Sequence, residues 1–315
     1  MIDSFGRNIT YMRISVTDLC NLRCLYCMPE AGIEKRPHRD IISVEEIGEI
    51  ARAAAKCGIK KIRLTGGEPL VRRGIIDICR RISATEGIEE LCITTNGILL
   101  PKYAEALKDA GVRRVNFSLD TLDAEKYRQL SRIGSLSDAL AGLDAAKNVG
   151  FSPIKINAVL MGGVNDDEIR KFAELTRDGD IHVRYIELMP MGACAEWAER
   201  HYLPGTAVLD ALPELEPAGT EGVTQRYRLP GYKGTVGIIT PVSSHFCGEC
   251  NRIRVTADGK LKTCLHSAPE HDLRGLSGEA LEEALRAAIL SKPWTHSLDG
   301  GAFSQTARNM NEIGG

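Results

Sequence analysis

Three cysteines near the N-terminus are the residues whose type and spacing most suggest chemistry. Cys20, Cys24 and Cys27 form a C-x3-C-x2-C pattern, with Tyr26 directly before the third cysteine. Thiolates bind zinc, copper or iron–sulfur clusters. A tetrahedral zinc site needs a fourth ligand nearby, and none is obvious beside this sequence. A four-iron cluster held by three thiolates leaves one iron open to an incoming ligand, so the pattern favours catalysis. A structural zinc loop remains the alternative.

A short glycine-rich sequence follows the next predicted strand, in Thr65-Gly66-Gly67-Glu68-Pro69. Two glycines allow a ligand to approach the backbone where a Cβ would obstruct it. The carboxylate of Glu68 can accept hydrogen bonds from an ammonium group. Taken alone, the motif also fits an ordinary turn.

A second group of three cysteines lies in the C-terminal third. Cys247 and Cys250 form a C-x2-C pattern, and Cys264 follows later in the chain. This spacing fits either a second cluster or a zinc ribbon, whose fourth ligand could be His245 or His266.

Two arginines follow the second group directly, in Arg252-Ile253-Arg254. On a strand both arginines point to the same face, and their planar guanidinium groups match phosphate oxygens. The net charge of −2 provides no general attraction for anions, so a polyanionic substrate would need such a local cluster. Solvated surface arginines are the alternative.

Together these motifs resemble the radical S-adenosylmethionine (SAM) enzymes and, among them, the GTP 3′,8-cyclase family of molybdenum cofactor biosynthesis. The resemblance runs from about Phe5 to the last residue. It includes the ending Gly314-Gly315, because that family finishes in a Gly-Gly tail that reaches into the active site. A frayed chain end is the alternative for these glycines.

The resemblance implies a role for each motif. Cys20, Cys24 and Cys27 would hold a SAM-cleaving [4Fe-4S] cluster. Cys247, Cys250 and Cys264 would hold a second [4Fe-4S] cluster, whose open iron meets the guanine base. The residues implied to line SAM are Tyr26, Gly67, Ser118 and Met189. The residues implied to contact GTP are Arg13, Arg63, Thr94, Lys155, Arg252, Ile253 and Arg254.

The implied reaction is the first step of molybdenum cofactor biosynthesis. Reductive cleavage of SAM yields a 5′-deoxyadenosyl radical, which takes hydrogen from C3′ of GTP. The C3′ radical attacks C8 of guanine, and reduction by one electron and protonation then give (8S)-3′,8-cyclo-7,8-dihydroguanosine 5′-triphosphate. The implied partners are an electron donor protein and the downstream cyclic pyranopterin monophosphate synthase. The protein would be a monomer or homodimer that binds neither nucleic acid nor membrane.

Three other functions remain as hypotheses. A radical SAM peptide-modifying maturase also has C-terminal clusters, although usually with more cysteines there. A non-catalytic zinc or iron–sulfur binding module would contain metal without chemistry. A SAM-dependent methyltransferase would yield S-adenosylhomocysteine instead of 5′-deoxyadenosine.

The composition is that of a soluble globular protein: 315 residues, of which 43% are hydrophobic and 26% charged. No apolar run reaches the roughly 18 residues of a membrane span, and the first residues do not resemble a signal peptide. We therefore expect a cytosolic protein, in which ten cysteines favour metal binding over disulfides. Cys57, Cys79, Cys92 and Cys194 lie outside both motifs, and we expect them to be buried free thiols.

Strand-like and helical sequences alternate through residues 1–204, which predicts parallel strands with right-handed crossovers. Helix 44–56 begins with a capping box formed by Ser43 and Glu46, and helix 101–110 ends at Gly111. Six such units predict an α/β fold, a partial (β/α)6 TIM-like barrel with its site at the carboxyl ends of the strands. The predicted strands are 11–17, 60–65, 90–95, 112–118, 154–160 and 181–189.

Residues 205–315 show a different pattern and are predicted to form a small α+β extension with the auxiliary cluster and the Gly-Gly tail, closing the barrel mouth. Residues 222–229 and 234–240 resemble short antiparallel strands. Strands 252–256 and 260–265 flank Ala257-Asp258-Gly259, which favours a tight hairpin. A helix is predicted at 278–290.

Overall fold

The predicted parallel strands are present and form a partial barrel. In the computed structural model, which describes residues 1–296, 298 and 304–314, β1 to β6 lie side by side in chain order. Every neighbouring pair among them is parallel. The six strands are β1 (Tyr11–Ser15), β2 (Lys61–Thr65), β3 (Glu90–Thr95), β4 (Arg114–Ser118), β5 (Ile154–Leu160) and β6 (Ile181–Glu187). The (β/α)6 prediction is therefore confirmed.

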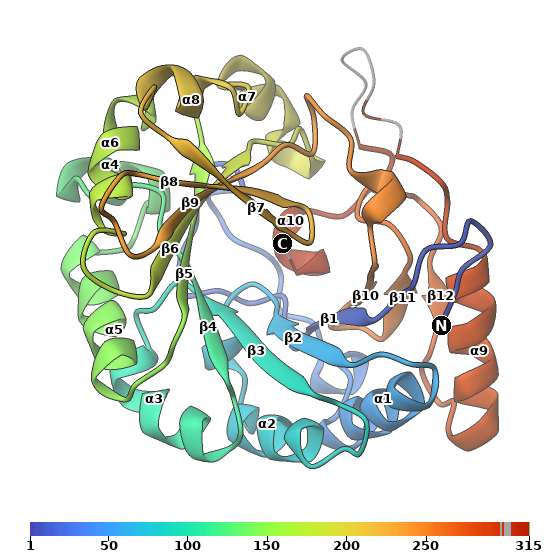
Figure 1. The fold of residues 1–315 in the computed structure, drawn as a ribbon. Helices are drawn as coiled ribbons and strands as arrows, with labels where there is room; N and C mark the ends of the chain where they lie inside the picture. Colours follow the sequence, from blue (N-terminus) through green and yellow to red (C-terminus); the bar gives the residue numbers. More distant parts are fainter. Residues whose placement is uncertain (297, 299–303, 315) are drawn as a thin grey trace.

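Helices surround the outside of this sheet (Figure 1). The predicted capping box is present at the first of them, where the Glu46 N–H donates to Ser43 Oγ at 3.1 Å and the Ser43 N–H donates to the Glu46 carboxylate at 2.7 Å. The outer helices are α1 (Val44–Lys56), α2 (Ile75–Ser83), α3 (Leu100–Asp109), α4 (Ala124–Ser131), α5 (Leu136–Asn148), α6 (Ile169–Glu174), α7 (Ala195–Arg200), α8 (Ala207–Ala211) and α9 (Gly278–Leu290). The short helix α10 (Met310–Ile313) instead lies near the middle of the barrel (Figure 1). Among the described residues, no helix combines the length and apolar character needed to cross a bilayer.

Side chains alternate along each strand between the helix-covered core and the barrel interior. Met12 and Ile14 of β1 are fully buried in the hydrophobic core, as are Ile62 and Leu64 of β2. Arg13 lies between Met12 and Ile14 and therefore points to the opposite face, toward the interior. The barrel interior is thus lined by polar and charged residues.

The C-terminal part of the chain adds strands to both edges of the same sheet. β9 pairs with β6, and β10 pairs with β1, both in parallel register. The resulting sheet has 12 strands in the order β12-β11-β10-β1-β2-β3-β4-β5-β6-β9-β8-β7. The added strands are β7 (Glu216–Glu221), β8 (Thr224–Arg228), β9 (Thr235–Ile239), β10 (Arg252–Val255), β11 (Lys260–Lys262) and β12 (His271–Asp272).

The predicted local structure of this part is largely correct. β8 and β9 are antiparallel, β10 and β11 form the predicted hairpin, and α9 has the predicted bounds. β7 was not predicted, because its sequence contains Pro217 and Gly219, which are depleted in strands. The sheet continues across the predicted boundary between residues 204 and 205, so the division into two domains stays a prediction.

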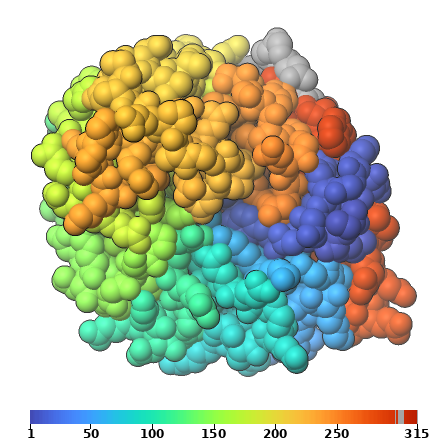
Figure 2. Space-filling model, in the orientation of Figure 1, coloured from blue at the N-terminus to red at the C-terminus, as the bar shows by residue number. Residues whose placement is uncertain are grey.

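β7 and β8 lie across one end of the barrel (Figure 1). In the space-filling view of this end, gold to orange atoms cover much of the upper part, with blue atoms to their right and cyan atoms below (Figure 2).

The four cysteines outside the two motifs are free thiols. Cys57, Cys79 and Cys92 are buried as predicted, whereas Cys194 is only half-buried. Predicted strands β1 and β6 end two residues earlier than expected, at Ser15 and Glu187. The residues beyond these ends belong to the loops that form the site.

Candidate active site at the carboxyl ends of the strands

The first cysteine triplet lies in the loop after β1. Cys20, Cys24 and Cys27 are half-buried free thiols. The Cys27 N–H donates to the Cys24 carbonyl at 3.0 Å, which closes a tight turn. The Leu22 N–H donates to Cys20 Sγ at 3.3 Å. Hydrogen bonds of this kind are found at the cysteine sulfurs of iron–sulfur clusters and tune their potentials.

The surroundings of this triplet oppose free thiolates. Burial raises the pKa of Cys20 to about 11. The pKa values of Cys24 and Cys27 are also raised, first by burial and then by other acidic groups that include Asp120. A bound cationic metal centre would reverse this preference, because metal-bound thiols are deprotonated. The type and spacing of these donors fit an iron–sulfur cluster.

Gly66 and Gly67 allow the cysteine loop to approach the end of β2. A Cβ at Gly66 would lie 2.3 Å from the Thr17 carbonyl oxygen, and one at Gly67 would lie 2.4 Å from the Leu19 carbonyl oxygen. The Gly67 N–H donates to the Thr17 carbonyl at 2.9 Å. The absent side chains thus make room for the main chain of the cysteine loop, and the contact of Gly67 with SAM stays a prediction.

Glu68 joins the loops after β2 and β3. Its side chain is buried, with 1% of the residue exposed. It accepts hydrogen bonds from Thr95 Oγ1 at 2.8 Å, the Asn96 N–H at 2.8 Å and the Leu70 N–H at 3.1 Å. Burial raises its pKa to about 7, although these donors oppose the shift.

Asn96 extends this connection to the first cysteine loop. Its Nδ2 donates to Asn21 Oδ1 at 2.8 Å and lies 3.8 Å from Cys20 Sγ. The sequence analysis did not select Asn96, and the available signal was its position directly after a strand of the barrel.

Tyr26 and Asp120 form a half-buried pair beside the cysteines. The Tyr26 hydroxyl donates to Asp120 Oδ2 at 2.7 Å, and the Val159 N–H donates to Asp120 Oδ1 at 2.8 Å. Burial raises the pKa of both side chains. Ser118, at the end of β4, is half-buried two residues before Asp120. Asp120 was missed, although it follows the fourth strand at the rim where such residues gather.

The second cysteine group and three of the seven predicted nucleotide residues line one cavity. Cys247 and Cys250 lie at a short turn before β10, and Cys264 follows β11. The cavity has a volume of about 140 Å³. Its lining includes Arg13, Met189, Cys247, Cys250, Arg252, Arg254, Cys264, Lys292 and Met310.

Cys250 differs in its electrostatics from the first triplet. Burial alone would raise its pKa, but Arg252 and Lys292 lower it to about 6. Lys292 is buried and donates to the carbonyls of Arg252 at 3.0 Å and Thr263 at 2.5 Å. Its position far from the motif explains why sequence analysis missed it.

A histidine pair adjoins this site. His245, Cys247 and His296 have ligand atoms within 4.8 Å of one another, the one such group found among the residues that the structure describes. The zinc alternative therefore keeps a geometric basis, with His296 as a further donor that the sequence did not suggest. Metal content decides between the two centres.

Cations from several strands point into the barrel. Arg13 and Arg63 lie opposite each other in register, and Lys155 follows on β5 with 2% of the residue exposed. Burial and the neighbouring cations lower the pKa of Arg13 to about 10. Burial and Arg184 lower the pKa of Lys155 to about 8, although Glu221 opposes this shift.

The interior also contains unsatisfied polar atoms. Arg63 Nε and Thr94 Oγ1 are buried and have no hydrogen-bond partner, which is costly unless a ligand supplies one. Glu221 of β7 is the acidic group among these cations, and it binds Arg184 at 3.0 Å and also Lys155. Arg184 was not selected from the sequence, because a lone arginine on a strand carries no motif.

Ile253 occupies a different place from its neighbours. It is fully buried in the hydrophobic core, beside Met12 in the register of β10 with β1. Any contact of Ile253 with a nucleotide would therefore involve its main chain, while Arg252 and Arg254 project to the interior.

The C-terminal segment lies between the two cysteine groups. Asn311 Nδ2 donates to the Asp18 carbonyl at 3.1 Å, and its main-chain N–H is directed to the Cys27 thiol, opposing the rise in that pKa. Met310 lines the cavity of the second group. Arg254 Nη1 donates to the carbonyls of Ile313 and Gly314. The tail thus reaches the site up to Gly314, and Gly315 lies outside the described residues.

Comparison with known proteins defines the class of this fold and site. Residues 14–176 match the model of the Radical SAM superfamily, and residues 181–298 match the model named Molybdenum Cofactor Synthesis C. Streptococcus suis SuiB bound to S-adenosylmethionine has the same fold, with a TM-score of 0.59 and 15% identity over 96% of this chain and 76% of that one. The chain belongs to the radical SAM superfamily, whose members use SAM and iron–sulfur clusters.

The chain is much more similar in sequence to a group of curated enzymes than to this solved structure. The GTP 3′,8-cyclases of Alkaliphilus metalliredigens and Alkaliphilus oremlandii are 51% and 49% identical to this chain over 320 residues, with complete coverage of both partners. That of Geobacter sulfurreducens is 49% identical over 325 residues, covering 100% of this chain and 99% of its own. The chain belongs to the GTP 3′,8-cyclase family.

Proposed function

We propose that this protein is a GTP 3′,8-cyclase that converts GTP to 3′,8-cyclo-7,8-dihydro-GTP in the first step of molybdenum cofactor biosynthesis. Full-length similarity to the cyclases supports the activity. The structural observation that supports the substrate is the interior lined by Arg13, Arg63 and Lys155 beside Arg252 and Arg254. Such a concentration of cations in a chain of net charge −2 suits a triphosphate.

The cysteine groups would hold the cofactors. Cys20, Cys24 and Cys27 would bind the cluster that supplies the electron for SAM cleavage, and the second group would bind an auxiliary cluster next to the guanine. Tyr26, Gly67, Ser118 and Met189 would line SAM. GTP would supply an acceptor for the unpartnered Arg63 Nε and a hydrogen-bond partner for Thr94 Oγ1.

The chain's own contribution is to orient the nucleotide. Arg252 and Arg254 lie on one strand, and Arg13 lies on the adjacent strand opposite Arg254. These guanidinium groups would hold the phosphates in a single pose and so keep C3′ at the place where hydrogen is removed. Holding reactants in one geometry is a large source of rate enhancement, and a closed barrel end excludes water.

The remaining parts of the proposal concern the location of the protein in the cell, its oligomeric state and its partner proteins. We propose a cytosolic protein, a monomer or homodimer, that receives electrons from a donor protein. Its product would pass to cyclic pyranopterin monophosphate synthase. Size measurement in solution and reconstitution with candidate donor proteins test these points.

Anaerobic reconstitution tests the proposal as a whole. The protein is supplied with iron and sulfide, its iron is counted, and GTP, SAM and a strong reductant are added. We expect about eight irons per chain, for two four-iron clusters, and formation of 5′-deoxyadenosine together with the cyclic nucleotide. Replacing GTP with ATP is the control. Absence of the cyclic product with both clusters present would contradict the proposed activity.

The same assay separates the rival functions. A peptide-modifying maturase would bind peptide in competition with GTP, and a methyltransferase would release S-adenosylhomocysteine. A structural zinc module would contain zinc and no iron chromophore. Full-length identity to cyclases favours none of these rivals.

A further inference from the structure

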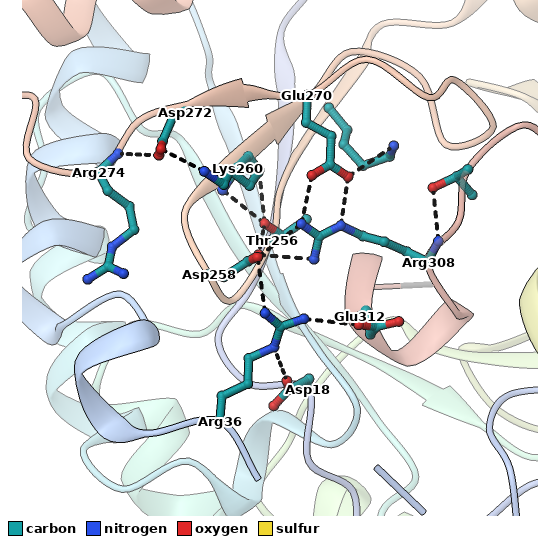
Figure 3. Close-up of polar contacts among 12 residues, drawn as sticks. Asp18, Arg36, Thr256, Asp258, Lys260, Glu270, Asp272, Arg274, Arg308 and Glu312 are labelled. Atoms are coloured by element: carbon teal, nitrogen blue, oxygen red, sulfur yellow. Dashed lines mark hydrogen bonds and ion pairs between the residues drawn. The ribbon is translucent and has the colours of Figure 1, made fainter. Parts of the chain in front are cut away.

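Two arginines and their carboxylate partners form a cluster beside the C-terminal segment (Figure 3). We call Arg36, Asp258, Glu270 and Arg308 the tail latch. Its members come from three parts of the chain: the segment after the first cysteine loop, the β10–β11 hairpin with the residues that follow it, and the C-terminal segment 304–314.

Arg308 is the centre of the latch. Its Nε and Nη2 donate to the two oxygens of Glu270 at 2.6 and 2.7 Å. Its Nη1 and Nη2 donate to the two oxygens of Asp258 at 3.1 and 3.0 Å. The side chain thus makes two bidentate ion pairs, the strongest geometry available to an arginine. Only 14% of the side chains of Arg308 and Asp258 is exposed, so solvent ions screen these charges weakly.

Arg36 joins the same hairpin to the first cysteine loop and to the tail. It donates to Asp258 at 3.3 Å, to Asp18 at 2.9 Å and to Glu312 at 3.1 Å. Asp258 therefore receives two arginines, and it also accepts a hydrogen bond from Thr256 at 2.5 Å. At the hairpin turn, Asp258 lies within reach of both the segment that contains Arg36 and the C-terminal segment that contains Arg308.

The segment held by the latch contacts both cysteine sites. Asn311 binds the Asp18 carbonyl, and Met310 lines the cavity of Cys247 and Cys250. The helix α10 that includes both residues has only four residues, and helices of that length are not stable by themselves. Its position must therefore be determined by contacts with the rest of the protein.

We propose that the tail latch holds the C-terminal segment docked between the two cysteine sites before any substrate binds, with Arg308 as the positioning residue. The latch fixes where Asn311 and Gly314 lie relative to both sites. This inference goes beyond the proposed function, because docking of the tail requires neither substrate nor turnover.

Hydrogen exchange of the ligand-free, anaerobically reconstituted protein tests the latch. In the unaltered protein we expect protected amides in α10. Arg308→Gln is expected to speed their exchange about tenfold or more, since it removes two charge-assisted pairs. Arg308→Lys keeps the charge and is expected to restore part of the protection. The matched control is Arg274→Gln. This exposed arginine lies near the same hairpin, where its side chain donates to the Arg39 carbonyl and its main-chain N–H donates to Asp272.

Further measurements separate local release from misfolding. Exchange in α9 and the iron content are expected to be unchanged in Arg308→Gln. Asp258→Asn is a second variant that weakens the pairs of both arginines, and we expect it to release the tail as well. Equal tail exchange in the unaltered, Arg308→Gln and Asp258→Asn proteins, or an unprotected tail in the unaltered protein, would overturn the proposal.

Discussion

The two cysteine sites have the same number of thiols but opposite electrostatic surroundings. Around the first triplet the acidic neighbours are Glu68 and Asp120, and burial raises the pKa of Cys20 to about 11. Around the second group, Arg252 and Lys292 overcome burial and lower the pKa of Cys250 to about 6. The first site therefore disfavours additional negative charge, and the second site favours it.

This difference matches the ligands proposed for the two sites. SAM is a cation at its sulfonium centre, so a site with acidic neighbours suits it. GTP has a polyanionic triphosphate, so a site surrounded by arginine and lysine suits it. Identical ligating atoms can therefore serve different ligands, because the strands and loops around them supply different charges.

The strongest test of the comparison is to disable the first site alone. Cys24→Ser is expected to abolish formation of 5′-deoxyadenosine, because the cluster would lose one of three thiolates. Product analysis by chromatography and mass spectrometry measures this. Cys57→Ala, which changes a buried thiol outside both motifs, is expected to remain active. Full activity of Cys24→Ser would show that the first triplet does not hold the cluster.

Removing positive charge from the second site is expected to have the next largest effect. Arg252→Ala is expected to weaken GTP binding by about 1.5–3 kcal/mol, or about ten- to a hundredfold, since charge-assisted bonds are lost. Cleavage of SAM at the first site is expected to continue. Binding is measured by equilibrium titration, with the exposed Arg286→Ala as control. Unchanged affinity would mean that Arg252 does not contact the nucleotide.

Thiol reactivity in the metal-free protein tests the two pKa directions. The lowered pKa of Cys250 keeps its thiolate at lower pH, so its alkylation rate is expected to rise up to about pH 6 and then level off. Because the pKa of Cys20 is about 11, its alkylation rate is expected to keep rising as the pH increases through 8 and above. Peptide mapping after timed alkylation measures both rates. In Arg252→Ala, the pH profile of Cys250 alkylation is expected to move to higher pH. Identical profiles for Cys20 and Cys250 in the unaltered protein would contradict the proposed difference between the two sites.

The smallest expected effect concerns stability near the first site. Burial raises the pKa of Glu68 to about 7 from an ordinary value of 4.5. The folded protein therefore holds this proton to higher pH than the unfolded chain, and stability falls as the pH rises between these two values. We expect a decrease of about 1–3 kcal/mol in the free energy of unfolding of the metal-free protein. Denaturant titrations across this range measure it, and Glu68→Gln is expected to remove this part of the pH dependence.

Much of the fold could be predicted because its signals are local. The six strands alternate with helices at regular spacing, and the capping box at Ser43 and Glu46 marks the start of α1 within a few residues. The Asp-Gly pair at Asp258 and Gly259 likewise predicted the β10–β11 hairpin. By contrast, β7 has no strand-like composition and exists because β8 offers it a partner.

Parts of the site lacked any such signal. Asn96, Asp120, Arg184 and Lys292 belong to no motif, and each acquires its role from a neighbour distant in sequence. Gly66 and Gly67 were correctly selected as places of close approach, but what approaches in this structure is the main chain of residues 17–19. A glycine is required whether a ligand or another main-chain segment approaches, because both need the space of a Cβ. Only the structure shows which atoms occupy that space.

The amino-acid sequence determined the number of parallel units, the two sets of thiols and the arginine pair beside the second set. These are properties of residue type and spacing along the chain, which local sequence contains in full. The tertiary structure alone decided that β9 and β10 join opposite edges of one sheet, that Asp258 receives both Arg36 and Arg308, and that α10 lies between the two cysteine sites. Those arrangements depend on packing and on charges from segments that are distant in sequence. The same local sequence patterns would allow many different strand and ion pairings, so they cannot select one.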